Sequence, residues 1–179
     1  MIPISSYIRT TLVALAFVAL AQHCAFASDQ DRCPRPIYFS EVLSDPNNPA
    51  SPTNFYITVD DATPELFDAN NPPAIITHQG AVEEWTIQNR TFEAHEFHQH
   101  QVHFLLEQQN GVPVPTAEQQ YLDMVQVPYW TGTGPYPSVT LRMDFRGMDV
   151  GDFVYHCHIL AHEDGGMMAI IRVLPPLDE

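Results

Sequence analysis

Clusters of turn-forming residues divide this chain into short runs whose composition is typical of strands. The 179-residue sequence contains 16 prolines and 8 glycines, and stretches such as 44–54 ("SDPNNPASPTN") and 128–137 ("PYWTGTGPYP") separate its apolar segments. Proline interrupts helices and central strands, and clusters of Pro, Asn and Gly mark turns. No heptad and no long 3.6-residue periodicity appears between them. The pattern predicts an all-β fold, an antiparallel Greek-key sandwich.

Eight segments carry the composition of strands. They are 36–43, 55–60, 74–89, 94–109, 121–127, 138–145, 151–157 and 167–176. Within 74–89, Trp85 and Ile87 are two residues apart and therefore point to the same face. A single helical turn is expected around 161–164. Together the segments predict one domain over residues 36–175, the size of a single sandwich domain.

The first 27 residues have the layout of a secretory signal peptide. Arg9 is followed by an apolar run over 11–21 and by the small-x-small sequence Ala25-Phe26-Ala27. The run is too short for a membrane span, and a bulky His23 before Cys24 argues against a lipoprotein. We expect a signal peptide at 1–27, an N-terminal tail at 28–35, and export of the protein to the periplasm or the exterior.

The charge balance is strongly acidic. Asp and Glu number 22 against 7 basic residues, none of them lysine, which gives a formal net charge of −15. Such a surface repels nucleic acid and anionic lipid, and it attracts cationic partners or metal ions. A role in solubility alone explains the same charge.

Two cysteines, Cys33 and Cys157, remain once the signal peptide is removed. A pair of cysteines in an exported protein normally suggests a disulfide. Cys157, however, lies between His156 and His158, and metal binding explains more of these surroundings. Cys33 is then left to pair between chains or with a missing segment.

Seven of the nine histidines fall in two clusters, and strand geometry sorts them further. The clusters comprise His95, His98, His100 and His103, and His156, His158 and His162. Successive side chains of a strand point to opposite faces, so His156 and His158 share one side and Cys157 faces the other. His98 and His100 likewise share a side. Two separate metal environments follow.

On the side of Cys157, the available ligands are this thiolate, His95, His162 and Met167. Two imidazoles, one thiolate and a distant thioether make the ligand set of a blue, type 1 copper site. Zinc accepts His and Cys, but a thioether suits copper better. The alternative for Met167 is that it opens an apolar last strand, the role that we assign to Met168.

The other side offers four imidazoles in two His-x-His pairs, with no thiolate and no carboxylate between them. They belong to His98, His100, His156 and His158. Imidazole ligands suit copper that meets dioxygen, because they leave open positions and tolerate both redox states. The alternative is a surface patch that chelates metal without chemistry. We interpret His78 and His103 as structural.

The sequence resembles the C-terminal cupredoxin domain of the multicopper oxidases, the family of laccases, ascorbate oxidase and bacterial cuprous oxidases. The likeness rests on "HEFHQH" at 95–100 and "HCHILAHEDGGMM" at 156–168, with "VEEWTIQN", "LDMVQVP" and "GDFVYHCHI" as context. It extends over about residues 36–174. It implies a Greek-key cupredoxin (plastocyanin-like) β-sandwich with copper as cofactor.

The resemblance also implies a role for each ligand. Type 1 copper would be held by His95, Cys157 and His162 with Met167 as the axial ligand, type 2 copper by His98, and the type 3 pair by His100, His156 and His158. Electrons from an unidentified reducing substrate would leave the type 1 site through the catalytic residues Cys157, His156 and His158. They would reach a trinuclear cluster that reduces dioxygen to water.

The chain departs from the family pattern in one major respect. The trinuclear cluster of the family takes eight histidines, and this sequence offers four of them. Glu96 also stands where the family usually has proline. We therefore expect the cluster to be completed by a partner, either a separate chain with an N-terminal-type copper domain or a second copy in a homo-oligomer.

Two other interpretations of the sequence stay open. The first is a stand-alone cupredoxin that carries electrons or binds copper without oxidase activity, and the second is a remnant of a longer oxidase. A copper nitrite reductase does not call for a histidine directly after the cysteine. A zinc hydrolase would have to use Glu163 or Asp164 as its base. Neither nucleic acid nor, after removal of the signal peptide, a membrane is expected as a partner.

Overall fold

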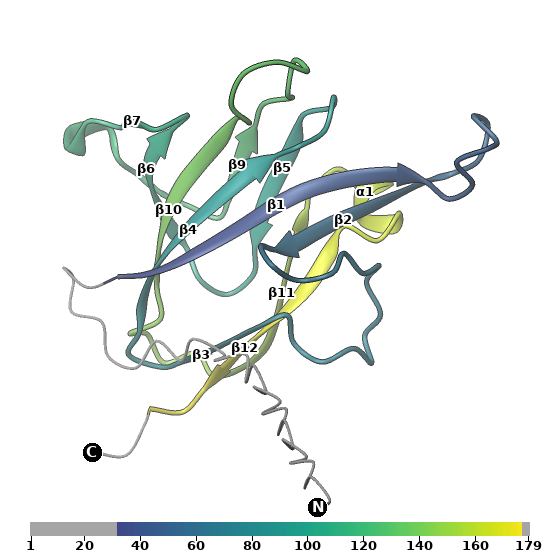
Figure 1. Ribbon diagram of the computed structural model, residues 1–179. Coiled ribbons are helices and arrows are strands. Elements are labelled where there is room, and N and C mark those ends of the chain that lie inside the picture. Colours follow the sequence, from purple (N-terminus) through teal and green to yellow (C-terminus); the bar gives the residue numbers. More distant parts are fainter. Residues whose placement is uncertain (1–31, 177–179) are drawn as a thin grey trace, which may run out of the picture.

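Two β-sheets pack face to face in the computed structural model, which describes residues 32–176 (Figure 1). The first sheet has the order β2-β1-β4-β10-β6-β7 with β8 paired to β6, and the second has the order β3-β12-β11-β5-β9. The strands of the first sheet are β1 (Cys33–Leu43), β2 (Thr53–Val59), β4 (Val82–Asn89), β6 (Phe104–Gln109), β7 (Val112–Pro113), β8 (Tyr121–Leu122) and β10 (Ser138–Asp144). Those of the second are β3 (Ile75–His78), β5 (His95–Gln99), β9 (Met124–Val127), β11 (Gly151–Cys157) and β12 (Met168–Leu174).

The predicted all-β sandwich is confirmed, and the helical turn expected near 161–164 is α1 (Leu160–Asp164). A 3₁₀ turn, η1 (Thr116–Glu118), is the other helical element of the described residues. The signal peptide expected at 1–27 lies outside them. The first strand begins at Cys33, earlier than the sequence pattern indicates.

Two strand pairs are parallel, which differs from the expected antiparallel arrangement. β1 pairs in parallel with β4, and β12 pairs in parallel with β3. The reason is the path of the chain, which passes through β3 in the second sheet before β4 returns beside β1. Parallel neighbours require such a crossover, whereas β1 and β2 form an antiparallel hairpin.

The core lies between the sheets and packs directly behind the histidine-bearing strands. Trp85 of β4 is fully buried, and its ring centroid lies 5.6 Å from that of Tyr155 on β11 and 6.3 Å from that of Phe97 on β5. Ile87 is also fully buried, as the shared face of residues 85 and 87 predicts. This aromatic packing holds β5 and β11 against the first sheet.

A buried ion pair joins the start of β1 to the same aromatic cluster. The guanidinium of Arg35 donates two hydrogen bonds of 2.8 Å to the carboxylate of Glu83, whose side chain is 0% exposed. The indole N–H of Trp85 donates to the same carboxylate at 2.7 Å. Both oxygens of the carboxylate thereby accept hydrogen bonds, as a buried charge requires.

We predict that Glu83→Ala strongly destabilises the fold, because it leaves a part-buried guanidinium and a buried indole N–H without their acceptor. The expected loss in the free energy of unfolding is about 3–5 kcal/mol, measured by urea denaturation of the metal-free protein. Asp152→Ala is the control, since it removes a solvent-exposed pair with Arg172 and should change stability little. Equal effects of the two substitutions would contradict the prediction.

Candidate metal centre

The pairing of β5 with β11 brings the two histidine motifs together. His98 lies opposite His156 in this antiparallel ladder, and Cys157 lies opposite Phe97. Since neighbouring side chains on a strand face opposite ways, the thiol of Cys157 and the ring of His156 diverge. The result is two separate groups of ligands, one on each side of β11.

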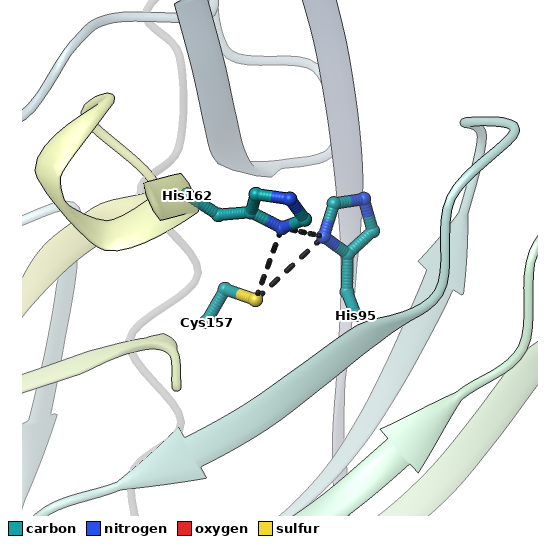
Figure 2. A group of neighbouring side chains, drawn as sticks. All are labelled: His95, Cys157 and His162. Atoms are coloured by element: carbon teal, nitrogen blue, oxygen red, sulfur yellow. Dashed lines mark hydrogen bonds between the residues drawn. The ribbon is translucent and has the colours of Figure 1, made fainter. Parts of the chain in front are cut away.

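His95, Cys157 and His162 form the first group, and their side chains point toward one another (Figure 2). The sulfur of Cys157 lies 3.6 Å from Nδ1 of His95 and 3.6 Å from Nδ1 of His162. The two nitrogens are 3.0 Å apart. A point equidistant from atoms with these separations lies about 2.0 Å from each, close to the about 2.0–2.3 Å at which His and Cys bind zinc. The triangle therefore fits a first-row metal ion.

The far nitrogens of both rings are held by other residues. Nε2 of His95 lies 2.8 Å from the hydroxyl of Thr91, and Nε2 of His162 lies 3.1 Å from the carboxylate of Glu93. Such partners fix the orientation of the ring and favour a tautomer with an unprotonated Nδ1, the form that binds metal. These hydrogen bonds aim both Nδ1 atoms at the centre of the triangle.

Asn89 organises the loop that carries these partners. Its carbonyl oxygen accepts hydrogen bonds from the backbone N–H and the hydroxyl of Thr91, both at 2.9 Å. Its amide nitrogen donates to the backbone carbonyls of Glu93, Val127 and Pro128. Asn89 is fully buried at the end of β4, so the loop before His95 is tied to the core by one side chain.

Burial favours the uncharged forms of His95 and Cys157 when no metal is bound. Desolvation, together with the nearby His162, lowers the pKa of His95 to about 3. Burial also raises the pKa of the Cys157 thiol, although backbone hydrogen bonds from Ile159 and Glu96 oppose this. A bound cation would instead favour the thiolate. This neutral, desolvated pair of imidazole and thiol suits a soft metal ion.

Met167 is fully buried and closes the loop behind the first group. Its N–H donates to the carbonyl of His162 at 3.0 Å, and its carbonyl accepts from the N–H of Cys157 at 3.1 Å. Gly165 precedes it by two positions, and a side chain there would meet the ring of Phe55 at 2.6 Å. Phe55 stacks on the ring of His162 with centroids 4.3 Å apart, so glycine permits this packing.

His98, His100 and His156 form the second group, in which one ligand atom from each residue lies within 4.8 Å of the others. The Nε2 atoms of His100 and His156 face each other at 3.2 Å. The opposite nitrogens are engaged elsewhere, because Nδ1 of His98 lies 2.8 Å from the carbonyl of Asp123 and Nδ1 of His156 lies 3.0 Å from that of Cys157. The imidazoles present their Nε2 atoms, again an arrangement that suits a metal ion.

His158 lies beside this group rather than within the converging three. Its ring centroid is 5.1 Å from that of His98 and 5.6 Å from that of His156. Both His158 and His100 are exposed, and His98 and His100 line a surface hollow of 200 Å³. The second group is thus open to solvent on one side, whereas all three residues of the first are buried.

The two remaining histidines of the described chain stand apart from both groups. Nδ1 of His78 lies 3.0 Å from the carbonyl of Pro175, while His103 is exposed and lines the same hollow as His98. Cys157 is a free thiol, so it forms no disulfide with Cys33.

Sequence reasoning missed the residues that hold the ligand rings in place: Asn89, Thr91, Glu93 and Phe55. A partial signal was present, because Asn89 ends an apolar strand and precedes Thr91 by two positions, a spacing typical of side-chain to backbone turns. Phe55 lies 107 positions from His162, and only the fold brings the two rings together.

The sandwich and its histidine–cysteine group define a cupredoxin-type domain. Residues 46–176 match the family described as multicopper oxidase. The chain belongs to this family, whose cofactor is copper.

Solved structures agree with this assignment. A multi-copper oxidase from Pediococcus acidilactici is 26% identical with a TM-score of 0.59, and the match covers 89% of this chain and 30% of that one. A multicopper oxidase from Campylobacter jejuni, described as a metallo-oxidase, is 25% identical with a TM-score of 0.61, covering 80% of this chain and 30% of that one. McoA from Aquifex aeolicus, at 21% identity and a TM-score of 0.58, shares the fold over 84% of this chain and 31% of its own.

This chain therefore spans about a third of the length of these multicopper oxidases. Among the described residues, no helix has the length and apolarity that a membrane span requires.

We predict that the stability of the copper-free protein falls as the pH drops below 6.5. The unfolded chain protonates His95 near its ordinary pKa of 6.5, whereas the folded protein resists protonation down to about 3. The unfolded state therefore binds one more proton than the folded state in this pH range. His95 alone should lower the free energy of unfolding by about 1.4 kcal/mol for each unit by which the pH falls.

The measurement is the difference in pH dependence between the parent and His95→Leu in urea denaturation, with an NMR titration of the His95 ring. Between pH 6.5 and 5, the free energy of unfolding of the variant should depend less steeply on pH than that of the parent. A His95 ring that titrates near pH 6.5 in the folded protein would contradict the expectation.

Proposed function

We propose that the chain binds type 1 copper through His95, Cys157 and His162, with Met167 as axial ligand. The observation that carries this proposal is the buried triangle of two Nδ1 atoms and one sulfur. The partners of the far nitrogens of both rings support it, because they orient the Nδ1 atoms toward the sulfur. The burial and backbone contacts of Met167 are compatible with the axial role.

We further propose that His98, His100, His156 and His158 are half of a type 2/type 3 copper cluster. Copper bound at the two sites would supply one-electron chemistry and the reduction of dioxygen to water. Cys157 belongs to the first group by its side chain and is bonded through the backbone to His156 and His158. The peptide chain from Cys157 to these histidines is the shortest covalent connection between the groups, and we assign it the transfer of electrons.

A partner would complete the second group. The rings of His100 and His158 are exposed, and no histidine of the described residues outside these four belongs to a converging ligand group there. We favour an N-terminal-type copper domain on another chain, because two half-sites of one design rarely fit each other. A homo-oligomer is the alternative, since a two-fold interface would bring two groups of four histidines together.

The N-terminal segment and the sandwich have separate roles in this proposal. We propose that residues 1–27 direct export to the periplasm or the exterior and that residues 36–175 form the copper domain. Mass spectrometry of the secreted product tests this proposal. The expected result is a mature N-terminus near Ser28.

We predict that copper content and oligomeric state together decide between an oxidase and an electron carrier. Copper per chain would be measured on size-resolved, copper-loaded protein, with oxygen consumption followed in parallel. About one copper on a blue monomer would support a carrier or an incomplete oxidase. About 2.5 per chain on a dimer would mean that two type 1 ions and a shared cluster are present. A monomer that consumes oxygen would contradict the need for a partner.

Matched variants assign the metal to each group. Cys157→Ser should abolish the blue colour, because the colour requires the thiolate. His100→Ala should lower only the copper beyond the first ion and leave the blue site intact. His103→Ala, an exposed neighbour outside both groups, serves as the control and should change neither.

We predict that Thr91→Val weakens copper binding at the first group by about 10- to 100-fold, as the loss of outer-shell partners typically does. Valine keeps the shape of threonine but cannot hold Nε2 of His95, so the ring is free to rotate away. Competition with a chelator measures the affinity, and the position of the blue absorption band reports the geometry. Thr91→Ser retains the hydroxyl and should restore both, whereas equal defects in the two variants would point to packing alone.

A further inference from the structure

A cavity of 310 Å³ lies between β2, the start of β12 and the long loop over 60–74. Ile57 and Val59 line it from β2, Met168 and Ile170 from β12, and Phe67 from the loop. The volume lies at the lower end of the range for small-molecule sites, about 300–1,000 Å³. The space and its walls suit one compact, largely apolar ligand.

The loop arches over this cavity between two anchors on the same segment. The N–H of Phe67 donates to the carbonyl of Gly166 at 3.2 Å, and the N–H of Ala74 donates to that of Ile170 at 2.9 Å. The residues between them are mostly exposed and carry few hydrogen bonds to the rest of the domain. Loops of this length without secondary structure are uncommon in compact domains and often bind ligands.

The charged residues that line the cavity are all acidic. Glu65 and Asp68 belong to the lining, which contains no basic residue. Hydrogen bonds from Asn70 lower the pKa of Asp68, so it is ionised at neutral pH. Thr58 also lines the cavity, is 4% exposed, and has a hydroxyl with no hydrogen-bond partner in the described structure. A buried hydroxyl in this state favours a ligand that supplies the missing partner.

The segment over 166–168 connects the cavity to the first ligand group. Its wall includes Met168, the residue after Met167, and its loop is anchored to Gly166, the residue before. Gly166 has a φ of +105°, and a side chain there would meet Leu66 of the loop at 2.6 Å. The segment that carries Met167 is therefore held between His162 on one side and the cavity loop on the other.

We propose that this cavity is a binding site for a small aromatic ammonium compound, whose ring fills the apolar space while its cation faces Glu65 and Asp68. Thr58 supplies a hydrogen bond from the wall. Binding fixes the loop over 60–74 and changes the environment of Met167 through Gly166. The last effect rests on the proposed type 1 copper site, whereas the binding itself does not.

The test titrates the full-length, copper-free protein with 2-phenylethylammonium and follows backbone amides by NMR. We expect saturable shifts at residues 58, 66–71, 74 and 168–170, and binding of neutral 2-phenylethanol that is several-fold weaker. Shifts that never saturate, or that spread over acidic residues elsewhere, would show non-specific attraction to the acidic surface and overturn the proposal.

Matched variants test each recognition element. Glu65→Gln combined with Asp68→Asn should weaken 2-phenylethylammonium several-fold, and Thr58→Val should weaken it by up to about tenfold, the value of one hydrogen bond. Glu118→Gln combined with Asp149→Asn removes the same charge from exposed positions outside the cavity and should leave the affinity unchanged. Equal losses in both charge-neutralised pairs would overturn recognition by the cavity.

The copper-loaded protein provides a separate readout. Saturation with 2-phenylethylammonium should shift the blue absorption band, because the segment carrying Met167 is fixed. Binding without any shift would overturn the coupling between cavity and copper. A protein that never becomes blue would refute the proposed copper site and leave the NMR result for the cavity standing.

Discussion

The antiparallel pairing of β5 with β11 is the contact on which the rest of this molecule depends. It sets His98 opposite His156 and Cys157 opposite Phe97, and alternation then sends sulfur and imidazole to different sides. A slip of one residue would turn the thiol toward the wrong group of histidines. The register is held from behind by the ring of Trp85, which contacts both strands. The core packing of Trp85 therefore also maintains the geometry of the ligands.

The sequence predicts this sorting of ligands because it follows from local spacing alone. Two histidines flanking a cysteine on one strand must diverge from it, whatever the fold around them. The residues that contact the rings cannot be predicted in this way. Thr91 reaches His95 from a loop. Phe55 reaches His162 from another strand. The parallel pairs of strands escape prediction for the same reason, because they depend on which sheet each segment joins. Short-range alternation is readable in a sequence, and long-range contact is not.

The two ligand groups satisfy their polar atoms by opposite means. In the first, the Nε2 atoms are held within the chain by Thr91 and Glu93, while the Nδ1 atoms converge with the sulfur on the centre of the triangle. In the second, exposed rings such as His100 and His158 can be hydrated, so an open position costs little. A domain of this design does not need further ligands at its second group to satisfy these rings. That property is compatible with the proposed half-site.

The properties of the first group are also set by parts of the chain that carry no ligand. The segment with Met167 is packed between Phe55 and Leu66, and both contacts require glycine at 165 and 166. The loop over 60–74 therefore packs against the segment that carries Met167, although it contributes no ligand to the first group. Backbone hydrogen bonds to the sulfur of Cys157 add a second influence from outside the ligand set. A change in the loop would reach the centre through these two glycines, without any substitution of a ligand.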